Sequence, residues 1–448
     1  MANVARVRAA LANPIVQVTA ANLTSVGLGT ISGVLTARGL GPEGRGHWAV
    51  VMAFFTVALV VAELGQSGAV TFLVARDPEH RRKVVRRARN IMCAGGIAVA
   101  AAGFLAAPAL AGGDSQTGNA YRLAAVGIVI NSLFAGQLFA MQAISIPRWN
   151  IARVAQPLFY VLGLATMLVL GRVSVTGVAI ALIASTSLQF VVLWSLRLSH
   201  RKCEASDDST EARAAPTGPR SSAQTSDVVT TTPTESLSQG GYGIRYAAAA
   251  VPTVLTAQYD KIILSRLVGP ADVGFYAVGS TVALLVAPFS AAIANVAFPR
   301  ASKRELSGAQ RRTFEITALL QVFFVSVVVS ACLCAVAPVA VPILFGPDFA
   351  AAIPVVWALA AVMVARAISQ VAGVLIRARG LPGAAAVAQI SGLALGAGLM
   401  FPCVNAFGLL GAAIALGVGE VATLSVVLIS LFRLQGADRV HMERESSA

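Results

Sequence analysis

Charged side chains are scarce in this sequence. Asp, Glu, Lys and Arg make up 12% of the 448 residues, whereas hydrophobic side chains make up 56%. A soluble globular protein carries about 25% charged residues, because its surface must be hydrated. Together with a mean hydropathy of +0.75, this composition excludes a soluble globular chain and predicts an integral membrane protein.

Cysteine and histidine are also rare, at five and four residues. Four of the cysteines lie in apolar segments, which argues against a disulfide framework or a zinc site. The histidines all lie outside these segments, which argues against a buried metal centre or a histidine proton relay. No P-loop, H-E-x-x-H or G-x-S-x-G motif is present. We therefore expect no enzyme activity, no metal and no cofactor apart from a coupling ion, H⁺ or Na⁺.

Long apolar segments are what the sequence does contain. A helix that spans a bilayer needs about 20 mostly apolar residues, because every backbone polar group must be paired within the hydrocarbon. Twelve segments meet this requirement. They are residues 14–37, 47–67, 90–111, 120–143, 151–171, 175–198, 242–267, 272–296, 314–338, 350–376, 384–402 and 408–432. The sequence thus predicts an all-α, polytopic membrane protein with twelve transmembrane helices.

The distribution of Lys and Arg predicts the orientation of these helices. If the N-terminus is cytoplasmic and the helices alternate, most of the 34 cations fall on the cytoplasmic side, and only a few, Arg45 among them, fall outside. Both termini would then be cytoplasmic, in a plasma membrane protein. The basic run 76–89 and the net charge of +14 fit contact with anionic lipid headgroups, so we expect no nucleic-acid partner.

One segment has a different composition. Residues 199–241 are rich in Ser and Thr, contain several Pro and Gly, and have no aromatic residue. Such a segment buries too little apolar surface to offset its ordering entropy. We predict a disordered cytoplasmic linker at 199–241, between a six-helix lobe at 1–198 and a second six-helix lobe at 242–448.

The two halves share a repeated motif. Residues 36–50 read TARGLGPEGRGHWAV and residues 264–278 read LSRLVGPADVGFYAV. The matched residues in the two copies include Arg38 with Arg266, Gly41 with Gly269, Pro42 with Pro270, and Gly46 with Gly274. A weaker repeat pairs Gln137 with Gln370. A parallel repeat predicts two pseudo-symmetric lobes around a central cavity, rocking about external hinge turns formed by the glycines and prolines.

Five ionisable residues lie within the predicted spans, where a charge costs several kcal/mol and normally faces a polar interior or a partner. They are Glu63, Asp260, Lys261, Arg366 and Glu420. We predict that Arg366, with Lys261, binds phosphate, because guanidinium presents a planar donor fork. Glu420 is either a counter-ion to Arg366 or a proton-titrating site. Asp260 and Glu63 are candidate ion-coupling residues, with a structural ion pair and an interfacial position as the respective alternatives.

Neutral polar side chains within the predicted spans would complete a cavity lining suited to sugars. The candidates are Gln17, Asn22, Asn131, Gln137 and Gln258. Their alternative role is hydrogen bonding between helices.

Three stretches carry a resemblance to a known family. They are RGLGPEGRG, ELGQSGAVTFLVAR and QYDKIILSRLVGPADVGFYAVGSTVALLVAPFSAAIANVAFPRASK. They resemble the Wzx-type polysaccharide flippases of the MOP (multidrug/oligosaccharidyl-lipid/polysaccharide) exporter superfamily. The resemblance implies a two-lobed bundle that flips a polyprenyl-pyrophosphate-linked oligosaccharide outward for surface polysaccharide biosynthesis, with membrane lipids and polysaccharide assembly enzymes as candidate partners.

Other cargoes fit the same fold. A cation-coupled multidrug exporter would require an acidic cavity, and a lipid II flippase is a further alternative in the same superfamily. A membrane-embedded glycosyltransferase or polymerase would place its catalytic residues in a large external loop, and the short external loops predicted here disfavour that class.

Overall fold

The computed structural model describes residues 14–77, 79–214, 239–301, 308–379 and 381–446, and this part of the chain contains helices and turns but no strand. The first half forms α2 (Pro14–Glu63), α3 (Gln66–Arg76), α4 (Arg81–Leu110), α5 (Ser115–Ile144), α6 (Ile146–Val169) and α7 (Val175–Ala214). The second half forms α8 (Gln239–Leu264), α9 (Pro270–Ala283), η1 (Leu284–Val286), α10 (Ala287–Ala301), α11 (Gly308–Phe345), η2 (Pro347–Ala352), α12 (Ile353–Ala378) and α13 (Pro382–Ser446).

Nine of the described helical stretches are long and apolar enough to cross a membrane. Two of them, 48 and 49 residues long, are broken by a non-helical glycine, Gly41 in α2 and Gly408 in α13. A straight helix of that length would measure about 70 Å, more than twice the ~30 Å hydrocarbon core, so each stretch contains two spans. The all-α, polytopic membrane architecture is confirmed. The count of twelve stays a prediction, because α8, with its charged Arg245, Asp260 and Lys261, does not reach the same apolarity.

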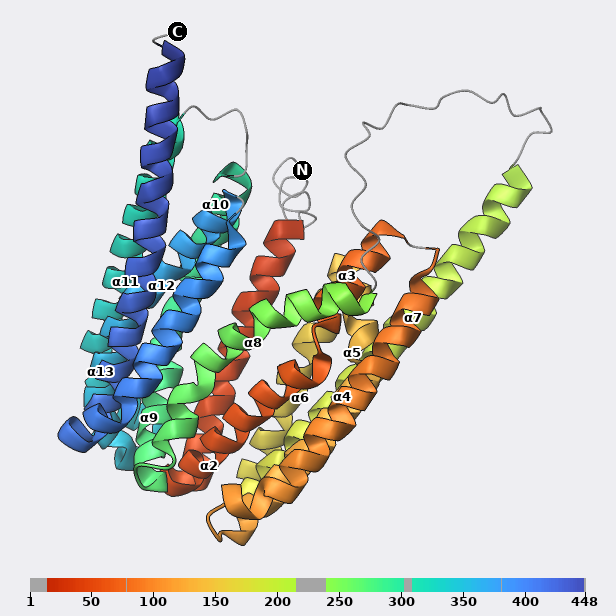
Figure 1. The fold of residues 1–448 in the computed structure, drawn as a ribbon. Helices are drawn as coiled ribbons and strands as arrows, with labels where there is room; N and C mark the ends of the chain where they lie inside the picture. Colours follow the sequence, from red (N-terminus) through yellow and green to blue (C-terminus); the bar gives the residue numbers. More distant parts are fainter. Residues whose placement is uncertain (1–13, 78, 215–238, 302–307, 380, 447–448) are drawn as a thin grey trace, which may run out of the picture.

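The helices form two groups that meet at one end and diverge at the other (Figure 1). We call the group α3–α7, with the second part of α2, the first lobe, and α9–α13 the second lobe. The first part of α2 and the whole of α8 lie between them. We call the end where α7 finishes and α8 begins the linker end, and the end that contains the turns at Gly41 and Gly269 the turn end. The lobes touch at the turn end.

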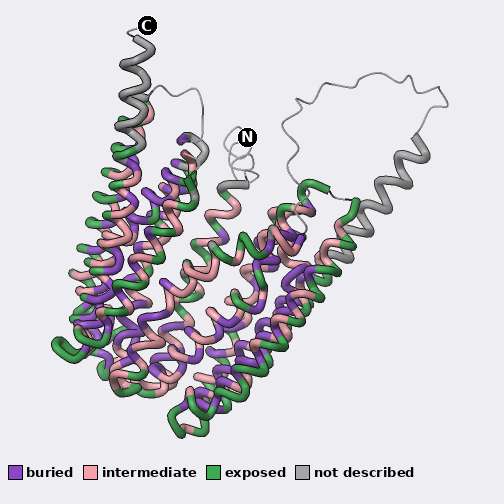
Figure 2. The backbone as a smooth tube through the Cα atoms, in the orientation of Figure 1, coloured by how far each residue is buried: buried purple, intermediate pink, exposed green. Residues whose placement is uncertain are grey.

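Each lobe has its own apolar core. Trp48, Ile128 and Leu164 belong to a cluster built from the first half of the chain, and Leu359 and Met400 belong to one built almost entirely from the second half. Buried residues run along the inside of each lobe and gather where the lobes meet (Figure 2). Two separate cores allow the lobes to move as units.

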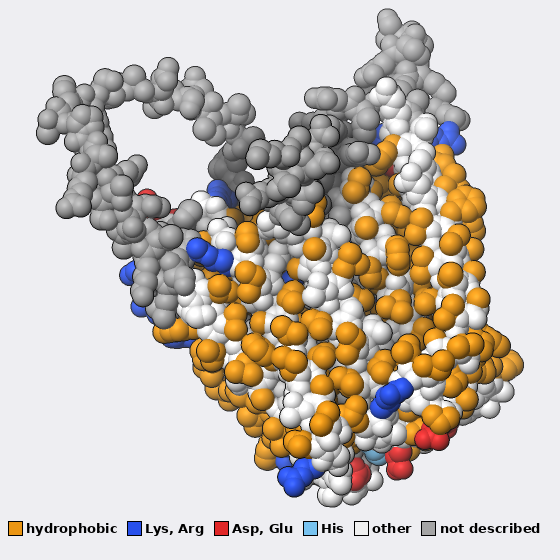
Figure 3. All heavy atoms as spheres, turned by 180° about the vertical axis from the view of Figure 1, so that it is seen from behind, with side chains coloured by type: hydrophobic (Ala, Val, Ile, Leu, Met, Phe, Trp, Pro, Cys, Tyr) orange, Lys and Arg blue, Asp and Glu red, His pale blue; other side chains and the backbone are white. Residues whose placement is uncertain are grey.

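The molecular surface fits a lipid environment. Hydrophobic side chains cover the middle of the face seen in Figure 3, while Lys, Arg, Asp and Glu side chains lie mostly toward its two ends. Large apolar side chains such as Leu105, Val169 and Val328 are exposed, which would be unfavourable in water. Membrane lipid is therefore the medium that contacts this surface.

The linker prediction is partly wrong. α7 continues to Ala214 and α8 begins at Gln239, so helix extends well into the segment 199–241. The sequence explains the difference, because residues 199–215 contain no Gly or Pro, the strongest helix breakers, and the first proline of the segment is Pro216. Residues 215–238 of the predicted linker lie outside the described residues, so their disorder stays a prediction.

Candidate functional site

A cavity of about 340 Å³, lined by both polar and apolar residues, lies where α8 meets the second lobe, between α8, α10, α12 and α13. We call it the second-lobe cavity. Its polar lining residues come from four different helices. They are Thr253, Thr256, Ser290, Arg366, Ser369, Gln370, Arg377, Gln389, Glu420 and Thr423. Arg366 and Glu420 are the two lining residues that the sequence analysis proposed for the site.

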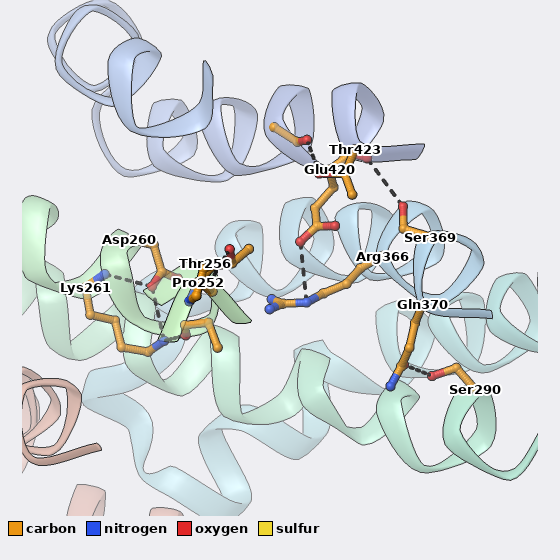
Figure 4. A network of polar contacts seen from close by, with 12 residues as sticks. Pro252, Thr256, Asp260, Lys261, Ser290, Arg366, Ser369, Gln370, Glu420 and Thr423 are labelled. Carbon is orange, nitrogen blue, oxygen red and sulfur yellow. Dashed lines mark hydrogen bonds and ion pairs between the residues drawn. The ribbon is translucent and has the colours of Figure 1, made fainter. Parts of the chain in front are cut away.

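An ion pair joins α12 to α13 in this cavity. The Nε of Arg366 lies 3.4 Å from Oε1 of Glu420, the contact expected for one of the two alternatives, a counter-ion to Arg366; the role of Glu420 in the site stays a prediction. The Glu420 side chain is 7% exposed and that of Arg366 is 28% exposed, so the guanidinium is the more accessible partner. It extends from α12 toward α8 (Figure 4). Arg366 can therefore reach a ligand while Glu420 holds one of its edges.

Spacing on α12 brings further groups to the same wall. Arg366, Gln370, Gly373 and Arg377 all line the cavity, at intervals of four, three and four residues that place them on one face of a helix. Arg377 follows the predicted span 350–376, and the sequence analysis proposed neither Arg377 nor Gln370 as a site residue. The periodic stripe and the repeat that matches Gln370 to Gln137 were the signals that could have found them.

Hydroxyl and amide groups complete the lining. Ser290 Oγ donates to Gln370 Oε1 at 2.8 Å, and Thr253 Oγ1 lies 3.1 Å from Gln389 Oε1. These contacts hold both amide groups at the cavity wall. The cavity thus offers two guanidinium groups, several neutral donors and acceptors, and a single carboxylate, which is a suitable set for an anionic, hydroxyl-rich ligand.

Asp260 and Lys261 form a separate cluster near this cavity. Asp260 is 4% exposed, and it accepts hydrogen bonds from the Tyr276 hydroxyl at 3.0 Å and the Lys261 backbone N–H at 2.8 Å. Lys261 Nζ lies 3.4 Å from Asp260 Oδ1. Asp260 and Lys261 thus form an ion pair within α8, which was the alternative role predicted for Asp260, and the Tyr276 hydroxyl ties this pair to α9. Neither residue lines the cavity. Their coupling and phosphate-binding roles stay predictions.

The remaining predicted site residues are dispersed. Gln17, Asn22, Glu63, Asn131, Gln137 and Gln258 are half-buried. None of them lines the second-lobe cavity, so their roles also stay predictions.

The repeated motif forms the contact between the lobes at the turn end. Gly41 makes the predicted turn with φ 67°, a conformation that favours glycine, and Pro270 follows Gly269 to begin α9. The prediction that Gly46 and Gly274 form turns is wrong, because both lie within helices. A β-carbon on Gly46 would overlap the carbonyl oxygen of Pro270, and one on Gly274 would overlap that of Pro42. The two copies touch each other reciprocally, through positions where a side chain has no room.

The repeated arginines reinforce this contact. Arg38 Nε donates to the Leu344 carbonyl at 2.7 Å, and its Nη2 donates to the Ile343 carbonyl, near the C-terminal end of α11. Arg266 Nη1 donates to the Ala109 carbonyl at 3.3 Å, near the C-terminal end of α4. A cation at this end of a helix is favoured by the helix dipole. Each arginine therefore caps a helix from the other half of the chain.

Asp114 begins α5 at the same end of the molecule. Its Oδ2 accepts a hydrogen bond from the Thr117 backbone N–H at 2.8 Å, and its side chain also accepts from the Thr117 hydroxyl. These hydrogen bonds, led by that of the hydroxyl, hold the pKa of Asp114 below its ordinary value. The carboxylate is therefore a helix cap that stays ionised well into mild acid.

Comparisons with known proteins agree with this architecture. The model of a family described as polysaccharide biosynthesis protein matches residues 11–305, while no curated protein matches. An inward-facing multidrug resistance MATE family transporter of the MOP superfamily is 16% identical, with a TM-score of 0.71 over 93% of this chain and 95% of that one. The lipid II flippase MurJ, in an inward closed conformation, is 13% identical, with a TM-score of 0.70 over 92% and 86%. An outward-facing multidrug resistance MATE family transporter is 16% identical, with a TM-score of 0.64 over 95% of this chain and 96% of that one.

Proposed function

From the membership of this chain in the polysaccharide biosynthesis protein family, as a multi-pass membrane protein with the fold of the MOP transporters, we propose that it flips a polyprenyl-pyrophosphate-linked oligosaccharide. The direction would be from the cytoplasmic to the external leaflet of the plasma membrane, for surface polysaccharide biosynthesis. The observation that carries the proposal is the charge of the second-lobe cavity, where Arg366 and Arg377 outnumber the one carboxylate, Glu420. The excess of positive charge in this cavity suits a negatively charged pyrophosphate.

The arrangement of the lobes supports a direction of access. The lobes are apart at the linker end and closed at the turn end (Figure 1). Because most cations lie on the linker side of the predicted spans, that end and both termini are cytoplasmic in our proposal. The charged head of the substrate would enter there, while the polyprenyl tail stays in lipid, and rocking of the lobes would open the turn end.

The Arg366–Glu420 pair offers a means of coupling to an ion. A phosphate that binds Arg366 would compete with Glu420 for the same guanidinium, and the released carboxylate would then take up H⁺ or Na⁺. The cycle needs no other cofactor. Enzymes of polysaccharide assembly, which would supply the substrate and consume the product, are the partners we propose.

A drug-exporting role fits this site less well. A cationic drug would need an acidic cavity, and the carboxylate of Glu420 is already paired with Arg366. Lipid II presents the same anionic chemistry as the proposed substrate and is therefore the second candidate cargo.

The decisive experiment uses a strain whose own gene is deleted and which is complemented with variants. Arg366→Ala should abolish surface polysaccharide at a normal protein level, because the phosphate loses its principal ligand, while Arg366→Lys should retain part of the export. Arg122→Ala is the matched control, since Arg122 contacts Asn119 on its own helix and the Phe104 ring on α4, both within the first lobe, and does not line the second-lobe cavity. Normal export by Arg366→Ala would refute the assignment, and altered drug susceptibility with unchanged polysaccharide would favour the exporter alternative.

A further inference from the structure

Arg45 is a cation that the sequence analysis placed in an external loop and that the structure buries. The residue is 9% exposed. Its Nη2 donates to Thr281 Oγ1 at 3.2 Å, whereas its Nε has no hydrogen-bond partner among the residues that the structure describes. No carboxylate of the described residues lies within ion-pair distance of it. A buried charge without a counter-ion lowers the stability of the folded chain, so the burial of Arg45 indicates a role other than stabilising the fold.

The guanidinium of Arg45 lies deep in the molecule. Thr281 follows Pro270, the first residue of α9, by eleven residues, which places it about 16 Å from the turn end. Gly33, beside which Arg45 Nη2 also lies, is eight residues before the turn at Gly41, or about 12 Å away. Both distances reach toward the middle of a ~30 Å hydrocarbon core. Arg45 is therefore at membrane depth.

The position of Arg45 relates it to the second-lobe cavity. Thr281 lies three residues, or about one turn, before Leu284, which lines that cavity. Arg45 itself is carried by the first lobe's part of α2, and it crosses the interface to reach α9. It is thus a first-lobe cation about one helical turn outside the cavity in which the second lobe presents Arg366.

Within the described part of the chain, no charged group compensates Arg45. The ionisable group that interacts with it electrostatically is the phenol of Tyr160 on α6, which is uncharged at neutral pH. A structural arginine in this place would be expected to have a carboxylate or several carbonyl acceptors. The charge of Arg45 is therefore only partly compensated, by one neutral hydroxyl, and an anion that reached the guanidinium would complete the compensation.

We propose that Arg45 is a second anion-binding group of the transport path, which receives the pyrophosphate of the lipid-linked sugar as the turn end opens. This rests on the proposed function. Arg45 directly precedes Gly46, whose contact with Pro270 closes the turn end. Separation of these backbones would withdraw α9 from the guanidinium and expose it to the passage. Since a phosphate there would balance the unpaired charge, the cargo would stabilise the opened state more than the closed one.

The first test compares ligand binding and stability in the purified full chain. The probes are undecaprenyl pyrophosphate and, as the uncharged control lipid, undecaprenol. Arg45→Met should bind the pyrophosphate at least tenfold more weakly, bind undecaprenol unchanged, and unfold at a higher temperature than wild type, because an apolar side chain replaces an unpaired buried charge. Arg45→Lys should retain part of the affinity. Thr281→Val, which removes the hydrogen bond but keeps the cation, should bind within twofold of wild type.

The outcomes separate this inference from the proposed function. If wild type binds undecaprenyl pyrophosphate no better than undecaprenol, the proposed function fails. Suppose that the wild type binds undecaprenyl pyrophosphate better than undecaprenol and that Arg366→Ala loses this preference. If Arg45→Met then binds both probes as the wild type does, only the role of Arg45 is overturned. Equal weakening of both probes by Arg45→Met would also overturn it, since that result indicates a packing defect. The second test measures surface polysaccharide export in cells that carry either variant. We expect export to fall with Arg45→Met and to stay unchanged with Thr281→Val.

Discussion

The two ends of the interface between the lobes are built on different principles. At the turn end, each contact is made twice by matched residues, Gly46 with Gly274 and Arg38 with Arg266. At the linker end, the start of α8 packs against the first lobe, where Gln239 Nε2 donates to Gln66 Oε1 at 3.1 Å and to the Val84 carbonyl at the same distance.

This difference indicates that the repeated motif forms the contact at only one end of the interface, the turn end. At the turn end, the symmetric contact closes the passage with matched residues from both halves of the chain. At the linker end, the hydrogen bonds of Gln239 tie α8 to the first lobe alone. On the α2 side, Gly27 and Gly29 face open space, since nothing lies near the β-carbon positions of either. The duplicated motif therefore specifies closure at the turn end, and the linker end can be open while α8 still holds the lobes together.

The largest effect is expected at Gly46. Gly46→Val should force the turn end apart, because its side chain would overlap the Pro270 backbone, which cannot move without its helix. Spin labels at Glu43 and Asp348, both exposed at the turn end, should report a longer distance than in the unsubstituted chain. Gly27→Val is the matched control, as Gly27 has open space around it. An unchanged label distance in a folded Gly46→Val protein would contradict the role of this contact in closure.

A smaller opening is expected from the arginine caps. Arg38→Ala should weaken closure by about 1–3 kcal/mol, the range for hydrogen bonds made by a charged group, and Arg266→Ala should weaken it less, since Arg266 makes one such bond where Arg38 makes two. The same pair of labels measures the populations. Arg122→Ala should leave them unchanged. If the Arg266 variant opens the turn end more than the Arg38 variant does, the ranking drawn from these bonds is wrong.

The smallest effect on the turn end is expected from the linker-end contact. Gln66→Leu leaves the buried amide of Gln239 with one acceptor fewer, at a cost of about 1–3 kcal/mol. Thermal unfolding should therefore show a lower Tm, while the label distance at the turn end stays the same. Gln66→Leu combined with Gln239→Leu should recover part of the lost stability. A change at the turn end as large as that of Arg38→Ala would show that the two ends are not independent.

Much of the fold followed from local patterns. The apolar segments predicted helices because the bilayer admits few other structures, and each predicted segment overlaps a helix of the structure. The pairing of Arg366 with Glu420 was among the predicted alternatives, because a charge at membrane depth needs a partner.

Other features were beyond the reach of the sequence. Arg45 looked like a loop cation since it follows a Gly-Pro turn, and only the packing of α2 against α9 shows that it is buried. Gly46 and Gly274 looked like turn residues because glycine serves both turns and close helix contacts. Which of the two roles applies depends on the neighbour across the interface.

The sequence by itself determined the membrane environment, the helices and the duplication, because these depend on composition, segment length and internal similarity. The tertiary structure alone decided which charges share a cavity, which cation is buried without a counter-ion, and which end of the two lobes is closed. The physical reason is that such properties belong to pairs of helices far apart along the chain, and the pattern within one helix does not specify the side chains of its neighbour.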